Sequence, residues 1–344
     1  MNSLIPERYA FETGVYRPPS EGGSDSLLIR LTRNCPWNHC TFCGMYKTEK
    51  FQVRSATDIK GDIDAMAALR DDLIKQSGAD GEISHQGAIA LIEKHPRLNH
   101  HQGFAMLYHW LLSGGKTVFL QDANSLIMKT DQLVEVLEYL RRTFPTIRRV
   151  TTYARSKTLV QKSLEDLKAI RQAGLDRLHV GLESGDDTVL KKIRKGATAE
   201  IHIKGGQKTL GAGFQLSEYW MPGLGGKALW EQHARNTARV LSEIDPHYIR
   251  SRPLRPWPGT PLAAEMEAGD FEMLTPTGQL QELRLTMQEL SVTGRVCFDH
   301  AGNYWRNRRG GLLFSQSYEG YPFPRGKQTV LDLIDEGLKV KAGT

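Results

Sequence analysis

The sequence predicts an α/β protein, a partial (β/α)6 TIM-type barrel followed by a small C-terminal α+β cap. Apolar runs of strand length alternate with stretches of helical spacing over residues 27–258. Such alternation is typical of a parallel sheet built from β-α units. Six units are too few for a closed eight-stranded barrel and enough for an open one.

Six strands are predicted in this alternation. They cover residues 27–32, 118–121, 149–153, 178–182, 214–220 and 247–250. Between them a helix is predicted at 130–143, where Leu133 and Leu137 recur at helical spacing, and another at 163–173, which ends at Gly174. The tail is predicted to add a helix near 277–291, a short strand at 295–298 and a closing helix near 327–339.

We expect three parts along the chain. They are an N-terminal arm over residues 1–26, the barrel over 27–258 with a helical insertion at about 55–115, and a capping region over 259–344. The insertion contains His85, His95, His100, His101 and His109. We interpret it as a polar helical insertion, because the adjacent residues 100 and 101 point apart on a regular element. A second metal site is the alternative.

Composition excludes some classes of protein. No stretch approaches 18 uninterrupted apolar residues, so no membrane span is expected. The first residues lack the basic-then-apolar pattern of a secretory signal, so we expect a cytoplasmic protein with reduced thiols. The net charge of +6 permits an acidic partner, but the basic residues are spread along the chain without a clear nucleic-acid footprint.

Three of the four cysteines, Cys35, Cys40 and Cys43, lie within nine residues directly after the first predicted strand. Parallel α/β sheets bind ligands at the carboxyl ends of their strands. Three thiolates suit a metal centre that keeps one coordination position open, such as an iron–sulfur cluster. A zinc site with His39 as fourth ligand is the alternative, although residues 39 and 40 are neighbours and cannot easily share a tetrahedral site.

This triplet, with Phe42 before its third cysteine, resembles the radical S-adenosylmethionine superfamily. Its spacing, Cys-x4-Cys-x2-Cys, is one residue longer than the commonest Cys-x3-Cys-x2-Cys. The resemblance implies an oxygen-sensitive enzyme in which Cys35, Cys40 and Cys43 hold a 4Fe–4S cluster that binds S-adenosylmethionine. It implies that the reduced cluster cleaves this cofactor to a 5′-deoxyadenosyl radical, which abstracts hydrogen from a substrate.

The run Gly181–Leu190, followed by Lys195, resembles the fourth-strand motif of one branch of this superfamily. That branch contains coproporphyrinogen dehydrogenase, the elongator catalytic subunit and methylthiotransferases. Its sixth strand and following turn resemble Arg250–Pro261 here. The resemblance implies that Glu183 contacts S-adenosylmethionine and that Lys195, with Arg194 as the competing choice, reaches its carboxylate.

The resemblance implies four further cofactor contacts. Phe42 is expected near the adenine and Tyr153 at the ribose. Asp122 and Asn124 are expected at the methionine amino group, where this sequence lacks the usual Gly-Gly-Glu.

Three residues of the C-terminal half are candidates for contact with a substrate. Arg250 and Arg252 alternate along the sixth strand, so they either bind an anionic substrate together or face solvent. Cys297 is either a small buried hydrophobe or a donor of a hydrogen atom to a product radical. It cannot hold an auxiliary cluster, because no other cysteine is available.

We therefore expect a radical S-adenosylmethionine enzyme that acts on an anionic small molecule. The resemblance implies a flavodoxin- or ferredoxin-type electron donor as partner. An enzyme that modifies RNA, such as tRNA, is the alternative, motivated by the basic sequence and the elongator-like motif. A non-enzymatic zinc or iron–sulfur binding module is the alternative from another class.

Overall fold

The computed structural model describes residues 6–14, 25–47, 50–78 and 82–340. Much of the predicted N-terminal arm, residues 1–5 and 15–24, lies outside the described residues. The chain divides into two compact units. The first unit comprises Met1–Pro36, Lys50–Tyr153 and Lys168–Arg177, and the second comprises Trp37–Glu49, Ala154–Leu167 and Leu178–Thr344.

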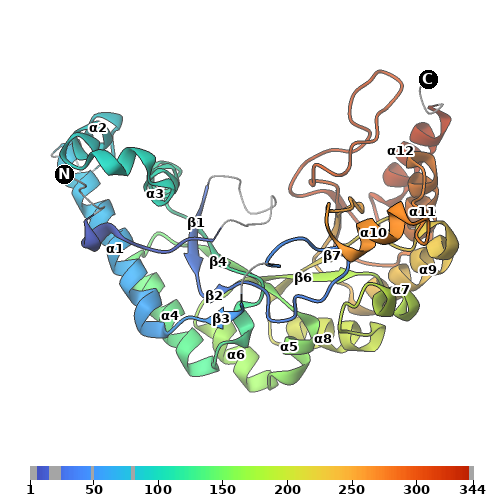
Figure 1. Cartoon of the computed structure of the whole chain (residues 1–344), viewed down its shortest axis with the longest axis horizontal. Coiled ribbons are helices and arrows are strands. Elements are labelled where there is room, and N and C mark those ends of the chain that lie inside the picture. Colours follow the sequence, from blue (N-terminus) through green and yellow to red (C-terminus); the bar gives the residue numbers. More distant parts are fainter. Residues whose placement is uncertain (1–5, 15–24, 48–49, 79–81, 341–344) are drawn as a thin grey trace. The chain divides into compact units, whose positions relative to one another are not determined.

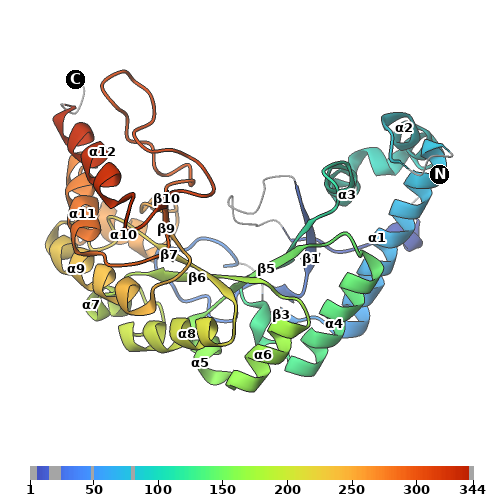
Figure 2. The same ribbon diagram turned by 180° about the vertical axis from the view of Figure 1, so that it is seen from behind.

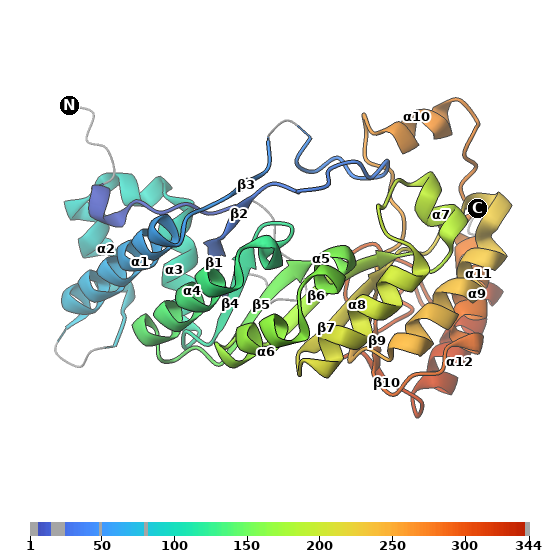
Figure 3. The same cartoon turned by 90° about the horizontal axis from the view of Figure 1, so that it is seen from below.

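Parallel strands form the centre of the first unit. They are β1 (Ser26–Arg30), β4 (Thr117–Gln121) and β5 (Arg149–Ala154), in that order. β1 pairs with β4 and β4 with β5 in parallel register. These strands confirm the first three predicted ones, except that the first strand ends at Arg30. Thr32 instead begins a separate antiparallel pair of β2 (Thr32–Arg33) and β3 (Gln52–Val53) (Figure 3).

Most of the long segment between β1 and β4 is helical, with α1 (Ala56–Ser77), α2 (His85–Lys94) and α3 (Gln102–Leu112). The helices of the first unit bury their apolar sides, as in α4 (Thr130–Thr143), which follows β4 and in which Leu133 and Leu137 are fully buried. α1 runs alongside α4 (Figure 1). The segment between β1 and β4 also contains η2 (Pro96–His100), whereas η1 (Glu7–Tyr9) precedes β1 and η3 (Ser125–Ile127) follows β4.

The second unit contains the remaining strands in sequence order. They are β6 (Arg177–Glu183), β7 (Gln215–Trp220), β8 (Tyr248–Ser251), β9 (Arg295–Cys297) and β10 (Tyr321–Pro322). β7 pairs in parallel with β8, and β8 in parallel with β9, whereas β10 is antiparallel to β9. The fourth, fifth and sixth predicted strands and the tail strand are confirmed. The tail strand pairs directly with the sixth.

The helices of this part of the chain agree with the predicted β-α alternation. They are α5 (Ser156–Gln161), α6 (Leu164–Gln172), α7 (Asp187–Lys192), α8 (Ala199–Gly211), α9 (Gly226–Ile244), α10 (Pro261–Glu267), α11 (Pro276–Glu289) and α12 (Lys327–Lys339). α11 packs against both α9 and α12 (Figure 2). Together with the strand order they confirm the α/β class. None of the helices described is both long and apolar enough to cross a bilayer.

Candidate functional site

The segment from Cys40 to Gly44 is held in place by three contacts within the second unit. The Thr41 N–H donates to the carbonyl of Ile193, just after α7, at 3.0 Å. The Thr41 carbonyl accepts from the N–H of Leu262, at the start of α10, at 3.0 Å. Gly44 packs on Trp257 so closely that a Cβ at position 44 would lie 2.3 Å from the indole ring. The loop therefore cannot move without disturbing α7 and α10.

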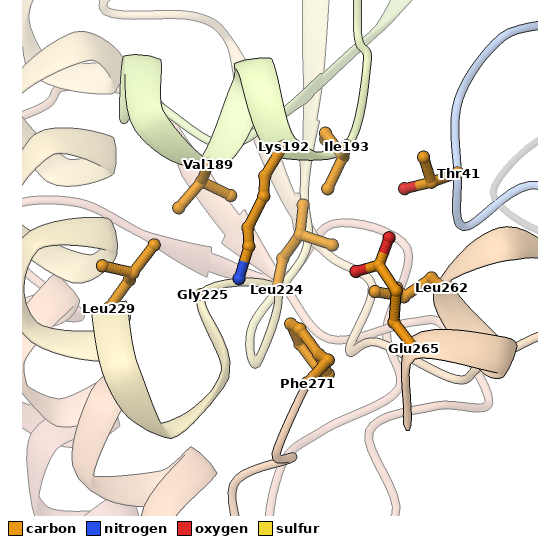
Figure 4. Close-up of a pocket in the computed structure, with 10 residues that line it drawn as sticks. All are labelled: Thr41, Val189, Lys192, Ile193, Leu224, Gly225, Leu229, Leu262, Glu265 and Phe271. Carbon is orange, nitrogen blue, oxygen red and sulfur yellow. The ribbon is translucent and has the colours of Figure 1, made fainter. Parts of the chain in front are cut away.

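A small cavity lies beside this segment. It is lined by Thr41, Val189, Lys192, Ile193, Leu224, Gly225, Leu229, Leu262, Glu265 and Phe271 (Figure 4). The Lys192 amine and the Glu265 carboxylate both extend toward it, whereas most of its lining is apolar. Its volume of about 10 Å³ holds at most a single water molecule, so it is not a pocket for a nucleoside.

Glu183 and Lys195 form an ion pair at the carboxyl end of β6. Their Oε1 and Nζ atoms are 2.9 Å apart, and the side chains are only 13% and 12% exposed. Glu183 has a φ of +65°, which residues with a Cβ seldom adopt. Gly181 leaves room for the pair, because a Cβ there would lie 2.2 Å from Glu183 Oε1. Arg194, the competing choice, has an exposed side chain.

Two residues not predicted from the sequence support the backbone of Lys195. The Trp37 indole N–H donates to the carbonyl of Arg194 at 2.7 Å, and Arg155 donates to the carbonyl of Lys195 at 2.8 Å. The Arg155 guanidinium also stacks over the Trp37 ring, 5.0 Å from its centroid. Trp37 could have been found from the sequence, because it lies between the first two cysteines of the cluster motif. For Arg155 the sequence indicated only that it follows a predicted strand.

Charged groups surround Cys40 within the second unit. Burial raises the pKa of the Cys40 thiol, Lys195 acts against that shift, and Glu183 adds to it. Glu218 on β7 is fully buried, and among the described residues neither of its carboxylate oxygens has a hydrogen-bond partner. Burial raises the pKa of Glu218 well above its usual range, with Lys195 opposing the shift. Glu218 is a third residue that was not predicted from the sequence, although a carboxylate inside a predicted strand was a visible signal.

Asp122 follows β4 directly and is buried in the first unit. Its Oδ2 accepts from Arg30 Nε and Nη2 at 2.9 and 2.7 Å, and from the Asn34 N–H at 3.1 Å. Its Oδ1 has no hydrogen-bond partner among the described residues, and a Cβ on Gly14 would lie 2.4 Å from it. Burial raises the pKa of Asp122, while the Arg30 hydrogen bond lowers it. One buried carboxylate oxygen of Asp122 thus lies beside Gly14 without a hydrogen-bond donor among the described residues.

Three other residues predicted as cofactor contacts lie in ordinary packing environments. Asn124 is buried just before η3. Tyr153 is half-buried in β5, with its ring edge-on to Phe119 at 5.2 Å between centroids. Phe42 is half-buried and packs against the apolar cluster around Leu190. Their contacts with the amino group, the ribose and the adenine stay predictions.

All four cysteines are thiols rather than disulfides. Cys35, Cys40 and Cys43 are half-buried, and Cys297 is buried. Cys35 belongs to the first unit, whereas Cys40 and Cys43 belong to the second. Three cysteines with few intervening residues supply the donor set of a cluster with one open iron position. Among the described residues, however, no three His, Cys, Asp or Glu side chains lie close enough together to hold a metal ion.

Arg250, a predicted substrate contact, is fully buried on β8. Its Nη1 lies 2.5 Å from Asp299 Oδ2, and its guanidinium stacks over the rings of Tyr248 and Tyr318 at 5.0 and 4.5 Å. Its charge is therefore already balanced. Arg252 is half-buried beyond the end of β8, and among the described residues no acceptor for its side chain is found.

Cys297 pairs with Arg250 in the register of β8 and β9. Its Sγ donates to the Tyr318 carbonyl at 3.5 Å, and Gly320 packs so closely that a Cβ there would lie 2.6 Å from Sγ. Burial raises the pKa of the Cys297 thiol to about 12, with Arg250 acting against that shift. The thiol is therefore protonated, which both predicted roles require.

Three cysteines clustered in the sequence, together with an ion pair at the carboxyl end of a strand in a parallel α/β fold, are typical of a class of iron–sulfur enzymes. Within that class the sequence matches the profile of the Radical SAM superfamily over residues 29–233, more than half of the chain. The chain therefore belongs to the radical SAM superfamily. Enzymes of this superfamily use a 4Fe–4S cluster and S-adenosylmethionine.

Several solved structures are similar. Coproporphyrinogen III oxidase from Escherichia coli is 14% identical, with a TM-score of 0.47 over 76% of this chain and 51% of that one. Elp3 from Methanocaldococcus infernus is 13% identical, with a TM-score of 0.46 over 73% and 61%. The methyltransferase TsrM from Kitasatospora setae is 15% identical, with a TM-score of 0.49 over 76% and 43%.

The chain spans only 43% to 61% of the length of these three solved chains. No curated protein sequence matches it significantly.

Proposed function

We propose that Cys35, Cys40 and Cys43 hold the cluster, and that the enzyme cleaves S-adenosylmethionine reductively to abstract hydrogen from a small anionic substrate. The observation that carries this proposal is the Glu183–Lys195 ion pair, because a half-buried carboxylate and ammonium acting on Cys40 suit a zwitterionic cofactor. When bound, the reduced cluster supplies the electron that splits the cofactor into methionine and a 5′-deoxyadenosyl radical.

The residues of this chain would orient the cofactor. Lys195 is proposed to bind its carboxylate, and Glu183 to contact it while keeping Lys195 in place. In the first unit Asp122 Oδ1, for which the described part of the chain offers no hydrogen-bond donor, is proposed to accept from the cofactor's amino group. Phe42, Asn124 and Tyr153 are proposed as further contacts with the adenine, amino group and ribose.

Arg252 is the proposed contact for an anionic substrate. Arg250 lies in the same segment but is neutralised by Asp299, whereas no carboxylate among the described residues neutralises Arg252. A half-buried guanidinium without a counter-charge favours an anion as ligand. We propose Cys297, which pairs with Arg250 in the sheet, as the donor of a hydrogen atom to a product radical.

The test is production of 5′-deoxyadenosine. Protein reconstituted with iron and sulfide without oxygen, and reduced by dithionite or by a flavodoxin- or ferredoxin-type donor, should release it from S-adenosylmethionine. Cys43→Ala should lose the cluster and the activity, whereas Cys297→Ala should keep the cluster. Absence of 5′-deoxyadenosine from a preparation with an intact, reduced cluster would refute the proposal.

The charge of the substrate can be tested before its identity is known. Small molecules from a cell extract are separated on an anion-exchange resin at pH 8, and each fraction is tested for faster 5′-deoxyadenosine formation. The stimulating fraction should be retained by the resin. If only the unretained fraction increases 5′-deoxyadenosine formation, the substrate is not an anion. Arg252→Met should weaken the response of the enzyme to the retained fraction.

A further inference from the structure

His233, on α9, is fully buried and forms hydrogen bonds through both ring nitrogens. Its Nδ1 lies 2.8 Å from the Ser184 hydroxyl, and its Nε2 lies 3.2 Å from the Met221 carbonyl oxygen. Ser184 follows Glu183 in the chain, and the Met221 N–H donates to the Glu183 carbonyl at 3.0 Å. One imidazole therefore contacts both backbone segments that hold Glu183.

The partners of this ring define its tautomer. The Met221 carbonyl can only accept, so Nε2 carries the hydrogen. The Ser184 hydroxyl oxygen accepts from the Asp186 N–H at 3.0 Å, which leaves its own proton to donate to Nδ1. Glu282 lies 3.3 Å from Nε2 as a second acceptor. Burial lowers the pKa of His233 to about 4, so the neutral ring that this pattern needs is the form present near neutral pH.

Other side chains of α9 bind the same turn after β6. Thr237 Oγ accepts from the Gly185 N–H at 2.9 Å, and Asn236 and Gln232 donate to the Asp186 carboxylate at 2.6 and 3.1 Å. Together with residue 233 these positions share one face of the helix. Gly185 permits this close approach, because a Cβ there would lie 2.3 Å from the Asn236 carbonyl oxygen.

Glu183 needs this support because its φ of +65° is left-handed. A residue with a Cβ keeps that conformation only where its surroundings impose it. We expect that without the hydrogen bonds that His233 makes with Ser184 and Met221, the backbone at Glu183 returns to an extended conformation. Its carboxylate would then leave Lys195.

We propose that His233 is a positioning residue, which holds Glu183 in the conformation that directs its carboxylate to Lys195. This inference rests on the proposed contact of Glu183 with S-adenosylmethionine. The competing explanation is that His233 only fills the core between α9 and β6. In that case its replacement would lower stability without a specific effect on cofactor binding.

The test measures binding of S-adenosylmethionine to the reconstituted holoenzyme by anaerobic equilibrium dialysis, without turnover. His233→Phe keeps a ring of similar size and removes both hydrogen bonds. Its Kd should rise about tenfold at unchanged iron content, because the left-handed residue loses its support. His233→Asn, whose side-chain oxygen can still accept from Ser184, should recover part of the affinity.

Leu241→Ala is the matched control, because Leu241 is buried on the same helix two turns further on. It should lower the Tm but leave the Kd within about twofold of wild type. The proposal is overturned if His233→Phe binds like wild type, if Leu241→Ala binds as weakly, or if His233→Asn shows no recovery. Should His233→Phe fail to fold, Ser184→Ala makes the same test, and a wild-type Kd there overturns the proposal.

Glu183→Gln separates this inference from the proposed function. Normal affinity in Glu183→Gln would refute the role of Glu183 itself. Weak affinity in Glu183→Gln combined with normal affinity in His233→Phe would refute only the role of His233.

Discussion

Replacing Lys195 by methionine separates the two candidates for the carboxylate of S-adenosylmethionine. Lys195 and Arg194 are adjacent in sequence, but only Lys195 is enclosed, at 12% exposure and 2.9 Å from Glu183. Arg194 contributes its carbonyl to Trp37 and leaves its side chain in solvent. If both substitutions keep the fold, the structure therefore predicts very different effects on cofactor affinity.

The size of each effect on the Kd follows from how far each charge is buried. A charge-assisted hydrogen bond in a partly buried site contributes about 1.5–3 kcal/mol, so Lys195→Met should raise the Kd by roughly 10- to 150-fold. An exposed charge contributes at most about 1 kcal/mol, so Arg194→Met should change the Kd by less than about fivefold.

The assay is equilibrium binding of radiolabelled S-adenosylmethionine to holoenzyme under anaerobic conditions, with iron content and Tm measured for each variant. The ion pair predicts one further result, which is that Lys195→Met should lose some stability because Glu183 remains half-buried without its partner. A larger loss of affinity in Arg194→Met than in Lys195→Met, with both proteins folded, would refute the assignment.

Two further predictions concern stability. Burial raises the pKa of Glu282 from 4.5 to about 8, so the folded state binds more protons and the free energy of unfolding falls as pH rises, by up to about 1.4 kcal/mol per unit. The buried His202, His233 and His300 oppose this slope near pH 6.5, because they are neutral in the folded state and bind protons in the unfolded state. The measurement is therefore the free energy of unfolding of wild type minus that of Glu282→Gln, from urea titrations between pH 6.5 and 8. This difference should fall as pH rises, and a difference that does not depend on pH contradicts the assignment. Asp299→Asn leaves the buried Arg250 without its counter-charge and should lower the free energy of unfolding in urea by about 3–5 kcal/mol. Asp335→Asn, in an exposed ion pair with Arg284, should lower it by about 1 kcal/mol or less. Equal losses in the two variants would show that burial does not determine the loss of stability.

The strands and most helices were predictable because each depends on a local pattern. Leu133 and Leu137 of α4, for example, are buried as their helical spacing predicted. The preference for Lys195 over Arg194 came from its distance in residues after Glu183 in the fourth-strand motif. The division into two units was not predictable, because it depends on which segments contact each other and not on the order of elements.

The supporting residues of the site were missed for the same reason. Arg155 and Trp37 donate hydrogen bonds to backbone carbonyl groups, and every residue has such a group, so the sequence does not indicate which one is bound. The partner of Arg250 lies 49 residues further on and is specified only by the pairing of β8 with β9. His233 bonds to a serine 49 residues before it, on a different element.

The Arg250–Asp299 pair has a consequence for synthesis of the chain on the ribosome. β8 is translated well before Asp299 and before Tyr318, whose ring covers the guanidinium. Until those residues emerge, burial of Arg250 would place an unpaired cation in the core, so β8 cannot settle into its final environment. A chain truncated before residue 299 should therefore fail to form a stable second unit, even though it contains every cysteine of the proposed cluster site.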